Sequence, residues 1–310
     1  MFTPLLVAAR TVNIGASILL AGIFTFDAII LLPGGRVGTG DFQEVERRLL
    51  RLAVWSLIVA ILSGLLWFWL EVASMNELSL KNALSEAAWR AVLFETRFGR
   101  VWQLRFGVIV AAFPLIWLCR AQVKARRALI LILWPLSVVF LASLALISHA
   151  AAASIQPLGL LGDMLHLCAV GGWIGGLLPL VIFLTRTRAS LALGEIVAAA
   201  LQRFSTLSLC CVGVLVVSGI SNSWLLVGSF HALFATAYGR LLLFKLALFG
   251  ILIVFGARNR FLIKAKLVKT PADKDLLPQL RRNVICEACF GAAVVAIVAC
   301  LGVTPPAGHS

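Results

Sequence analysis

The chain has 310 residues, of which 61% are hydrophobic and 13% charged, and its mean hydropathy is +1.03. A soluble domain could not bury so much apolar surface, so the composition excludes a soluble globular protein and indicates that most of the chain lies in a lipid bilayer. The formal net charge of +14 would suit a nucleic-acid-binding protein. However, the basic residues gather in alternate loops between apolar runs, and we therefore expect no nucleic-acid partner.

Eight apolar runs are each long enough to cross a hydrocarbon core, which takes about 20 residues of helix. Each should be an α-helix, because unpaired backbone groups are costly in lipid. The first run is expected to be a retained span rather than a removed signal, because it lacks a preceding basic segment. The predicted fold class is all-α, a polytopic integral membrane protein. The runs cover residues 5–31, 52–70, 101–119, 128–147, 159–184, 205–227, 240–257 and 284–303.

Basic residues mark the odd-numbered loops between these runs. The positive-inside rule places these loops in the cytoplasm, so both termini are expected on the outer side of the membrane. The main expected role of the basic loops is to orient the chain, with contact to anionic membrane lipids as a lesser alternative. The seventh loop is the richest, with Arg258, Arg260, Lys264, Lys266, Lys269, Lys274, Arg281 and Arg282.

Short motifs recur between the two halves of the chain. The Ser-Gly pair at 63–64 recurs at 218–219, and the Thr-Arg-Phe-Gly-Arg motif at 96–100 recurs as Thr-Ala-Tyr-Gly-Arg at 236–240. The sequence therefore predicts two tandem four-helix repeats in the same orientation, residues 1–153 and 154–310. Chance similarity among Leu- and Ala-rich helices is the alternative. Matching offsets also pair Gly22 with Gly175, Asn13 with His166, and Arg105 with Lys245.

All four histidines fall at the predicted outer ends of the helices, and this asymmetry is the main functional clue. Imidazole is a versatile metal ligand, and the thioether of Met164 favours Cu(I). Asp163 shares a helical face with His166 and is expected to bind the metal or to orient a ligand. The alternative is that the histidines are interfacial side chains bonded to carbonyls or water. The predicted metal site comprises His149, His166, Met164, Asp163 and His231.

Thiols and buried charges form a second group of candidates. Cys210 and Cys211 in the sixth run, and Cys286 and Cys289 in the eighth, could supply thiolates at the inner end, although packing is the commoner role for such residues. Ionisable residues inside apolar runs should be paired or hydrated, because an unpaired charge there is costly. The residues concerned are Arg10, Asp27, Arg105, Asp163, Lys245 and Glu287.

Four stretches, in this order, resemble a known family. They run from Asp163-Met164-Leu165-His166 to Trp173-Ile174-Gly175-Gly176, from Arg203-Phe204-Ser205 to Ser218-Gly219, and from Tyr238-Gly239-Arg240 through Lys245 to Gly256-Ala257-Arg258-Asn259-Arg260, followed by Glu287 and Pro305-Pro306. Together they resemble the bacterial copper-resistance protein D family (CopD), whose members are polytopic inner-membrane proteins. The resemblance implies copper transport or homeostasis at the bacterial inner membrane, with periplasmic termini and copper delivery by a periplasmic protein of the CopC type. The chain has three methionines, so it lacks the methionine-rich copper path that the resemblance would suggest.

Two other functions compete with copper transport. Paired histidines on adjacent helices can ligate haem b, so His149 and His166 could instead serve a membrane electron carrier. A membrane scaffold without a ligand is a further alternative. Enzymatic catalysis is not expected, because the sequence contains neither a nucleophile with its base nor a nucleotide-binding loop.

Overall fold

The computed structural model describes residues 3–34, 40–122, 125–148, 156–186, 194–227, 229–263 and 276–305. Within these ranges there is no β-strand, and eight helical spans are long and apolar enough to cross a membrane, which confirms the predicted all-α membrane fold. The spanning helices are α1 (Thr3–Thr25), α2 (Gly40–Met75), α4 (Arg97–Ala121), α5 (Arg126–Ala142), α6 (Gln156–Arg186), α7 (Gly194–Val227), α9 (Ala237–Arg258) and α11 (Leu276–Leu301).

Several helices are longer than the apolar runs in the sequence. Helix α2 has 36 residues and α7 has 34. At about 1.5 Å per residue, both exceed a hydrocarbon core of roughly 30 Å. The extra turns of α2 carry polar residues, including Arg48, whose Nε lies 2.7 Å from Oε1 of Glu44 one turn earlier. Such i,i+4 pairs favour helix outside the apolar run, so the helix begins before the run does.

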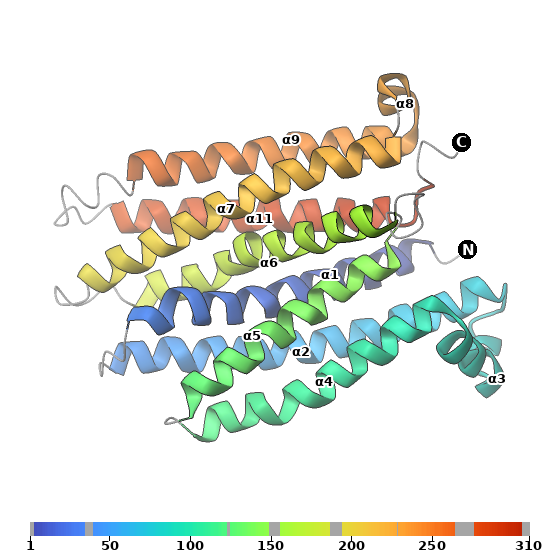
Figure 1. Ribbon diagram of the computed structural model, residues 1–310, viewed down its shortest axis with the longest axis horizontal. Coiled ribbons are helices and arrows are strands. Elements are labelled where there is room, and N and C mark those ends of the chain that lie inside the picture. Colours follow the sequence, from blue (N-terminus) through green and yellow to red (C-terminus); the bar gives the residue numbers. More distant parts are fainter. Residues whose placement is uncertain are drawn as a thin grey trace.

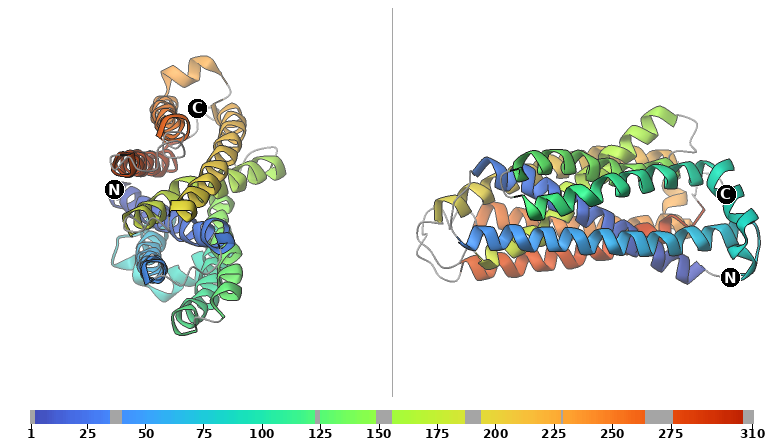
Figure 2. Two further views of the ribbon diagram at one scale, coloured as in Figure 1. Left: turned by 90° about the vertical axis from the view of Figure 1, so that its left-hand side faces the viewer. Right: turned by 90° about the horizontal axis from the view of Figure 1, so that it is seen from below.

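The spans lie side by side along the long axis of the molecule (Figure 1). Both chain termini lie at one end, together with the short helices α3 (Glu86–Arg90) and α8 (Phe230–Ala235), and we call this the terminal end. We call the opposite end, where α5 begins and α9 finishes, the basic end. The helices of the first half occupy one side of the bundle and those of the second half the other, as the view along the axis in Figure 2 also shows.

Helices α1 and α6 form the centre of the bundle and are the most buried of the eight spans. A Cβ atom added to Gly22 of α1 would lie 2.1 Å from the carbonyl carbon of Gly175 of α6, so the two backbones are in contact. Small residues allow such a close approach of membrane helices. Helices α2 and α5 pack against α1, and α7 and α11 pack against α6.

The recurring motif at 96–100 and 236–240 has the same local structure in both halves. The Oγ1 atoms of Thr96 and Thr236 accept hydrogen bonds from the backbone N–H of Gly99 (2.9 Å) and Gly239 (3.0 Å), and so cap α4 and α9. A Cβ atom on either glycine would lie 2.2 Å from a carbonyl oxygen of the preceding turn. The threonine thus starts each helix, and the glycine lets the preceding turn fold back against it.

Candidate functional site

His166 of α6 lies in the terminal half of the bundle and contacts α7. Its Nδ1 is 2.9 Å from Oγ of Ser218, and the Ser218 hydroxyl donates to the carbonyl oxygen of Val214 at 2.6 Å. Since a hydroxyl has one proton, Ser218 must accept from the Nδ1–H of the imidazole. The hydrogen-bond network therefore assigns the tautomer in which Nε2 keeps a lone pair. That nitrogen is able to bind a metal ion.

Asp163 lies one turn before His166 on the same face of α6, as its spacing predicts. Its Oδ1 accepts a hydrogen bond from Nδ2 of Asn222, and its Oδ2 accepts one from the hydroxyl of Ser148. Asn222 lies one turn after Ser218 on α7. The carboxylate and the imidazole therefore face the same side of α7, and each is oriented by a side chain from that helix.

Lys245 of α9 extends this group of polar side chains. It lies within electrostatic range of both Asp163 and His166. A charged side chain inside a membrane bundle is stabilised by an opposite charge, and Asp163 offers that charge to Lys245. In the absence of a bound ion, the carboxylate and the ammonium group therefore compensate each other beside a neutral imidazole.

Two further predicted ligands are close to this group in the sequence. His149 lies outside the described residues, and it follows directly on Ser148 in the chain. Met164 is half-buried and stands two positions before His166. Because successive residues of an α-helix are turned by about 100°, the thioether leaves α6 on a different face from the imidazole.

His231 is exposed on α8, and its ring makes no side-chain hydrogen bond within the described part of the chain. Among the described residues, no three His, Cys, Asp or Glu side chains are grouped so that they could hold a metal ion. Of the five predicted ligands, Asp163 and His166 each bond to α7, Met164 leaves α6 on another face, and His231 is exposed on α8.

The candidate thiols do not gather at the inner end. Cys210 and Cys289 are exposed on the outside of their helices, and Cys286 is half-buried. Cys211 is buried, with its Sγ 3.1 Å from the position that a Cβ of Gly172 would take. These placements favour packing and lipid contact as the roles of the cysteines.

The first half has a related set of contacts without a histidine. Asn13 stands where the second half has His166, and its Nδ2 is 3.3 Å from Oγ of Ser63, the counterpart of Ser218. Oδ1 of Asn13 accepts a hydrogen bond of 2.9 Å from Arg105, the counterpart of the lysine in α9. The two halves thus place similar contacts at matching positions, but only the second has an imidazole there.

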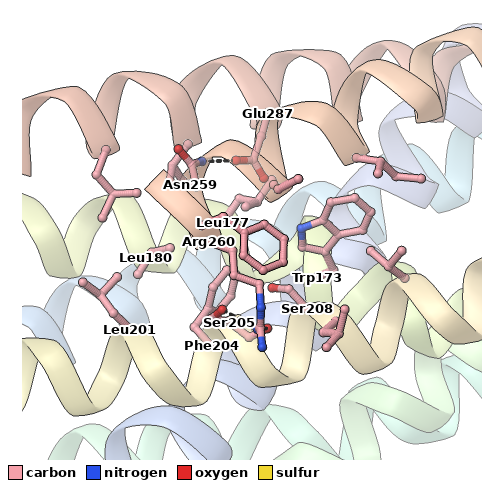
Figure 3. A pocket seen from close by; sticks show the side chains of 18 residues that line it. Trp173, Leu177, Leu180, Leu201, Phe204, Ser205, Ser208, Asn259, Arg260 and Glu287 are labelled. Carbon is pink, nitrogen blue, oxygen red and sulfur yellow. Dashed lines mark hydrogen bonds between the residues drawn. The ribbon is translucent and has the colours of Figure 1, made fainter. Parts of the chain in front are cut away.

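A cavity of about 260 Å³ lies closer to the basic end, between α6, α7, α9, α11 and the segment η8 (Asn259–Ile263) (Figure 3). Most of its wall is apolar. Its polar groups include Glu287, which accepts a hydrogen bond from Nδ2 of Asn259, and Arg260, which donates to Oγ of Ser205 at 2.7 Å. The sequence marks Glu287 as an intramembrane charge but does not reveal the cavity. One feature of the sequence does indicate the cavity. Gly256 stands at the position that the larger Ile116 occupies in the first half.

Two family profiles match the chain: the N-terminal domain of copper resistance protein D-like proteins over residues 1–156, and copper resistance protein D over residues 198–301. The chain is 28% identical over 246 residues to the copper transport protein CutJ of Bacillus subtilis (strain 168), a match that covers 76% of this chain and 44% of CutJ. It is 27% identical over 219 residues to copper resistance protein D of Pseudomonas syringae pv. tomato, covering 68% of this chain and 70% of that protein. It is 29% identical over 275 residues to the inner membrane protein YebZ of Escherichia coli (strain K12), covering 84% and 87%.

The match thus spans less than half the length of CutJ. No solved structure matches the chain. The first of the two profiles covers half of the chain, and the second covers much of the remainder, including Ser218, Lys245 and Glu287. The chain therefore belongs to the copper resistance protein D family of membrane proteins.

Proposed function

We propose that this protein is an inner-membrane copper transporter that takes copper at its periplasmic end, at a site built around His166, and moves it across the membrane. The observation that carries the proposal is the hydrogen bond between Nδ1 of His166 and Ser218, which leaves a lone pair on Nε2. Asp163, one turn earlier on the same face of α6, is bonded to the same neighbouring helix. Relatives named as copper transport and copper resistance proteins support copper as the transported ion.

In this proposal the terminal end faces the periplasm and the basic end faces the cytoplasm. The support is the positive-inside rule, because the basic end carries the arginine-rich starts and ends of the helices. The similarity to an inner membrane protein supports that membrane as the location. Copper then arrives from the periplasm, and a copper-binding protein of the CopC type is the proposed donor.

The proposed site uses His166 and His149 as nitrogen ligands. His149 follows Ser148 in the chain, and the hydroxyl of Ser148 donates to Asp163. Asp163 supplies a negative charge and is held in place by two donors. Met164 leaves α6 on another face and His231 is exposed on α8. We assign both to the capture of copper before it reaches His166.

The same proposal assigns different roles to the two repeats. Residues 1–153 form mainly a scaffold and contribute His149 near their end, and residues 154–310 carry most of the copper site. The support is the pattern of matched contacts, in which Asn13 and Ser63 repeat the geometry of His166 and Ser218 without offering an imidazole. A duplicated bundle with one substituted position explains why the two halves share packing and differ in chemistry.

The test is copper binding to the detergent-purified protein, followed by copper uptake into proteoliposomes. We expect about one copper per chain for the wild type and none after His149→Ala and His166→Ala are combined. The control is His231→Ala, which should keep the bound copper because the exposed ring of α8 makes no bond to the His166 group. Unchanged binding in the double variant would remove both histidines from the site.

A further inference from the structure

Glu287 is a buried carboxylate that the copper site does not use. It lies on the membrane-spanning helix α11, and only 3% of its surface is exposed. None of the ion pairs in the described part of the chain includes it. An ionisable group inside a membrane bundle is costly to keep, and such groups commonly mark ion or proton pathways.

The carboxyl group of Glu287 is held by an N–H donor from another element. Nδ2 of Asn259 donates to Oε1 (Figure 3), and the indole ring of Trp173 lines the same cavity as the carboxyl group. Nδ2 of Asn283 donates to Oδ1 of Asn259 at 2.9 Å, and this bond fixes which side of the Asn259 amide faces the carboxyl group. The neutral form of this group needs no opposite charge inside the bundle, and the N–H of Asn259 is placed to stabilise the charged form. The group is thus placed to gain and lose a proton.

The cavity beside this carboxyl group has room for water that could accept the proton. Its volume of about 260 Å³ is large enough for several water molecules, since one needs roughly 10–15 Å³ measured in this way. It lies in the half of the bundle that contains the basic end, which we assign to the cytoplasm. A proton released into the cavity would therefore have a short route to the cytoplasmic side.

Among the described residues that line the cavity, Arg260 is the one charged side chain besides Glu287. Lys245 of α9 is not among them and lies within electrostatic range of Asp163 and His166. Arg260 shares the cavity, but its guanidinium is bound to the hydroxyl and carbonyl oxygens of Ser205 at 2.7 and 2.9 Å. On α1, Arg10 lies against the far, terminal end of α11. Asp27, which follows α1, is bound by an arginine of α5, and His166 of α6 is bonded to α7. Helices α6 and α7 contribute no titratable side chain to the described cavity wall.

The described part of the first half does not repeat a cavity of this size. At the matching position the structure has a void of only about 10 Å³, whose wall includes Leu20 and Ile116, the counterparts of Trp173 and Gly256. Cys119 stands where the second half has Asn259. Two halves that share a scaffold therefore differ at this point, which is expected if the cavity serves a function in the second half alone.

We propose that Glu287 is a proton-binding site that couples copper movement to proton movement, an inference that rests on the proposed transport function. The neutral carboxyl group gives its proton to a water molecule in the cavity, and the proton leaves toward the cytoplasm. The remaining carboxylate is held by Asn259 while a copper ion passes nearby, so one positive charge replaces another. When the copper has left toward the cytoplasm, the carboxylate takes up a proton from the periplasmic side, so that one proton crosses the membrane with each copper ion.

The first test is infrared spectroscopy on the purified protein, which detects the carbonyl stretch of a protonated carboxylic acid without requiring transport. We expect this band in the wild type and in Glu86→Gln, a control that removes an exposed carboxylate of α3. The band should be lost in Glu287→Gln and kept in Glu287→Asp. A band that persists unchanged in Glu287→Gln would overturn the assignment of the proton site.

The second test is copper uptake into proteoliposomes with and without an imposed pH gradient. The gradient should change the uptake rate several-fold in the wild type and in Glu86→Gln, and should have no effect in Glu287→Gln. If the rate of copper uptake by the wild type does not change with the pH gradient, the coupling is wrong, but the transport function is still supported. If no variant takes up copper while the infrared band still depends on Glu287, the transport function fails and the proton site remains.

Discussion

Gly22 of α1 and Gly175 of α6 touch backbone to backbone at the centre of the bundle, and they stand 153 positions apart at matching places in the two halves. Where two related units meet across a two-fold axis, residues near the axis contact their own counterparts. The glycine contact is what an axis along the helices, between α1 and α6, would produce. It supports the proposal that two parallel four-helix repeats make up this chain.

Substitution of Gly22 should therefore destabilise the whole bundle. A Cβ atom at this position would lie 2.1 Å from the carbonyl carbon of Gly175, so Gly22→Ala must push α1 and α6 apart. Overpacking of this kind costs about 1–3 kcal/mol, and the backbone overlap places the variant at or above that range. The control is Gly15→Ala on the same helix, where a new Cβ meets nothing within 4 Å. Thermal unfolding in detergent should show a lower midpoint for Gly22→Ala alone.

Loss of the Ser218 hydroxyl should weaken copper binding while leaving the histidine in place. Ser218→Ala removes the acceptor of the Nδ1–H of His166, so the ring is no longer fixed in one tautomer and orientation. Loss of such a supporting bond typically lowers metal affinity about 10–100-fold. The matched control is Ser63→Ala, which removes the equivalent bond to Asn13 in the first half. Equal copper affinity in the two serine variants would argue against the proposed role of Ser218.

The sequence was sufficient to predict the helical fold, because hydrophobic length is a strong signal in lipid. The apolar runs predicted the positions of all eight spans. They did not predict the polar turns by which α2 and α7 extend beyond the apolar runs. Those turns depend on local pairs such as Glu44 with Arg48. The ends of a helix are less constrained by the bilayer than its middle.

The site was only partly predictable, because helix spacing reports neighbours on one helix and not across helices. The i,i+3 spacing correctly placed Asp163 and His166 on one face. Their partners Ser218 and Asn222 come from α7, and the faces on which two helices meet depend on packing. The cavity near Glu287 depends on side-chain volumes from several helices at once, so no single stretch of sequence encodes it.

Arg105 should be essential for folding, although it forms no ion pair in the described part of the chain. It is fully buried, and its guanidinium donates to Oδ1 of Asn13 at 2.9 Å and to the carbonyl oxygen of Phe140 at 2.8 Å. Arg105→Ala would leave Oδ1 of Asn13 without its donor, at about 1–3 kcal/mol, whereas the carbonyl oxygen of Phe140 would still accept from the Ser143 hydroxyl. Arg100→Ala, an exposed position on the same helix, is the control. The yield of monodisperse protein in detergent should fall for Arg105→Ala and not for Arg100→Ala.

The purified protein should show no haem spectrum. The alternative function as an electron carrier requires haem b beside His166, yet direct side-chain bonds to Ser218 and Asn222 join α6 to α7 at that level. A macrocycle between these helices would break both bonds. An absorption spectrum of protein purified from cells grown with a haem precursor checks this, and a Soret band that His166→Ala abolishes would establish the alternative.

Filling the cavity should stop copper movement without disturbing copper binding. A Cβ atom at Gly256 would lie 3.7 Å from Cζ2 of Trp173, so Gly256→Ile can be accommodated only by occupying the cavity, as its counterpart Ile116 does in the first half. The variant should fold, because the first half tolerates isoleucine at this position. Copper should still bind near His166, which lies toward the other end of α6.

Gly250→Ile provides the matched control for this variant, because it adds the same side chain to the same helix at an exposed position with open space. Copper uptake into proteoliposomes should fall strongly for Gly256→Ile and stay near the wild-type rate for Gly250→Ile. If Gly256→Ile binds and transports copper normally, the ion does not pass the cavity. Copper movement would then not depend on the space beside Glu287, and the path must be sought along another face of α6.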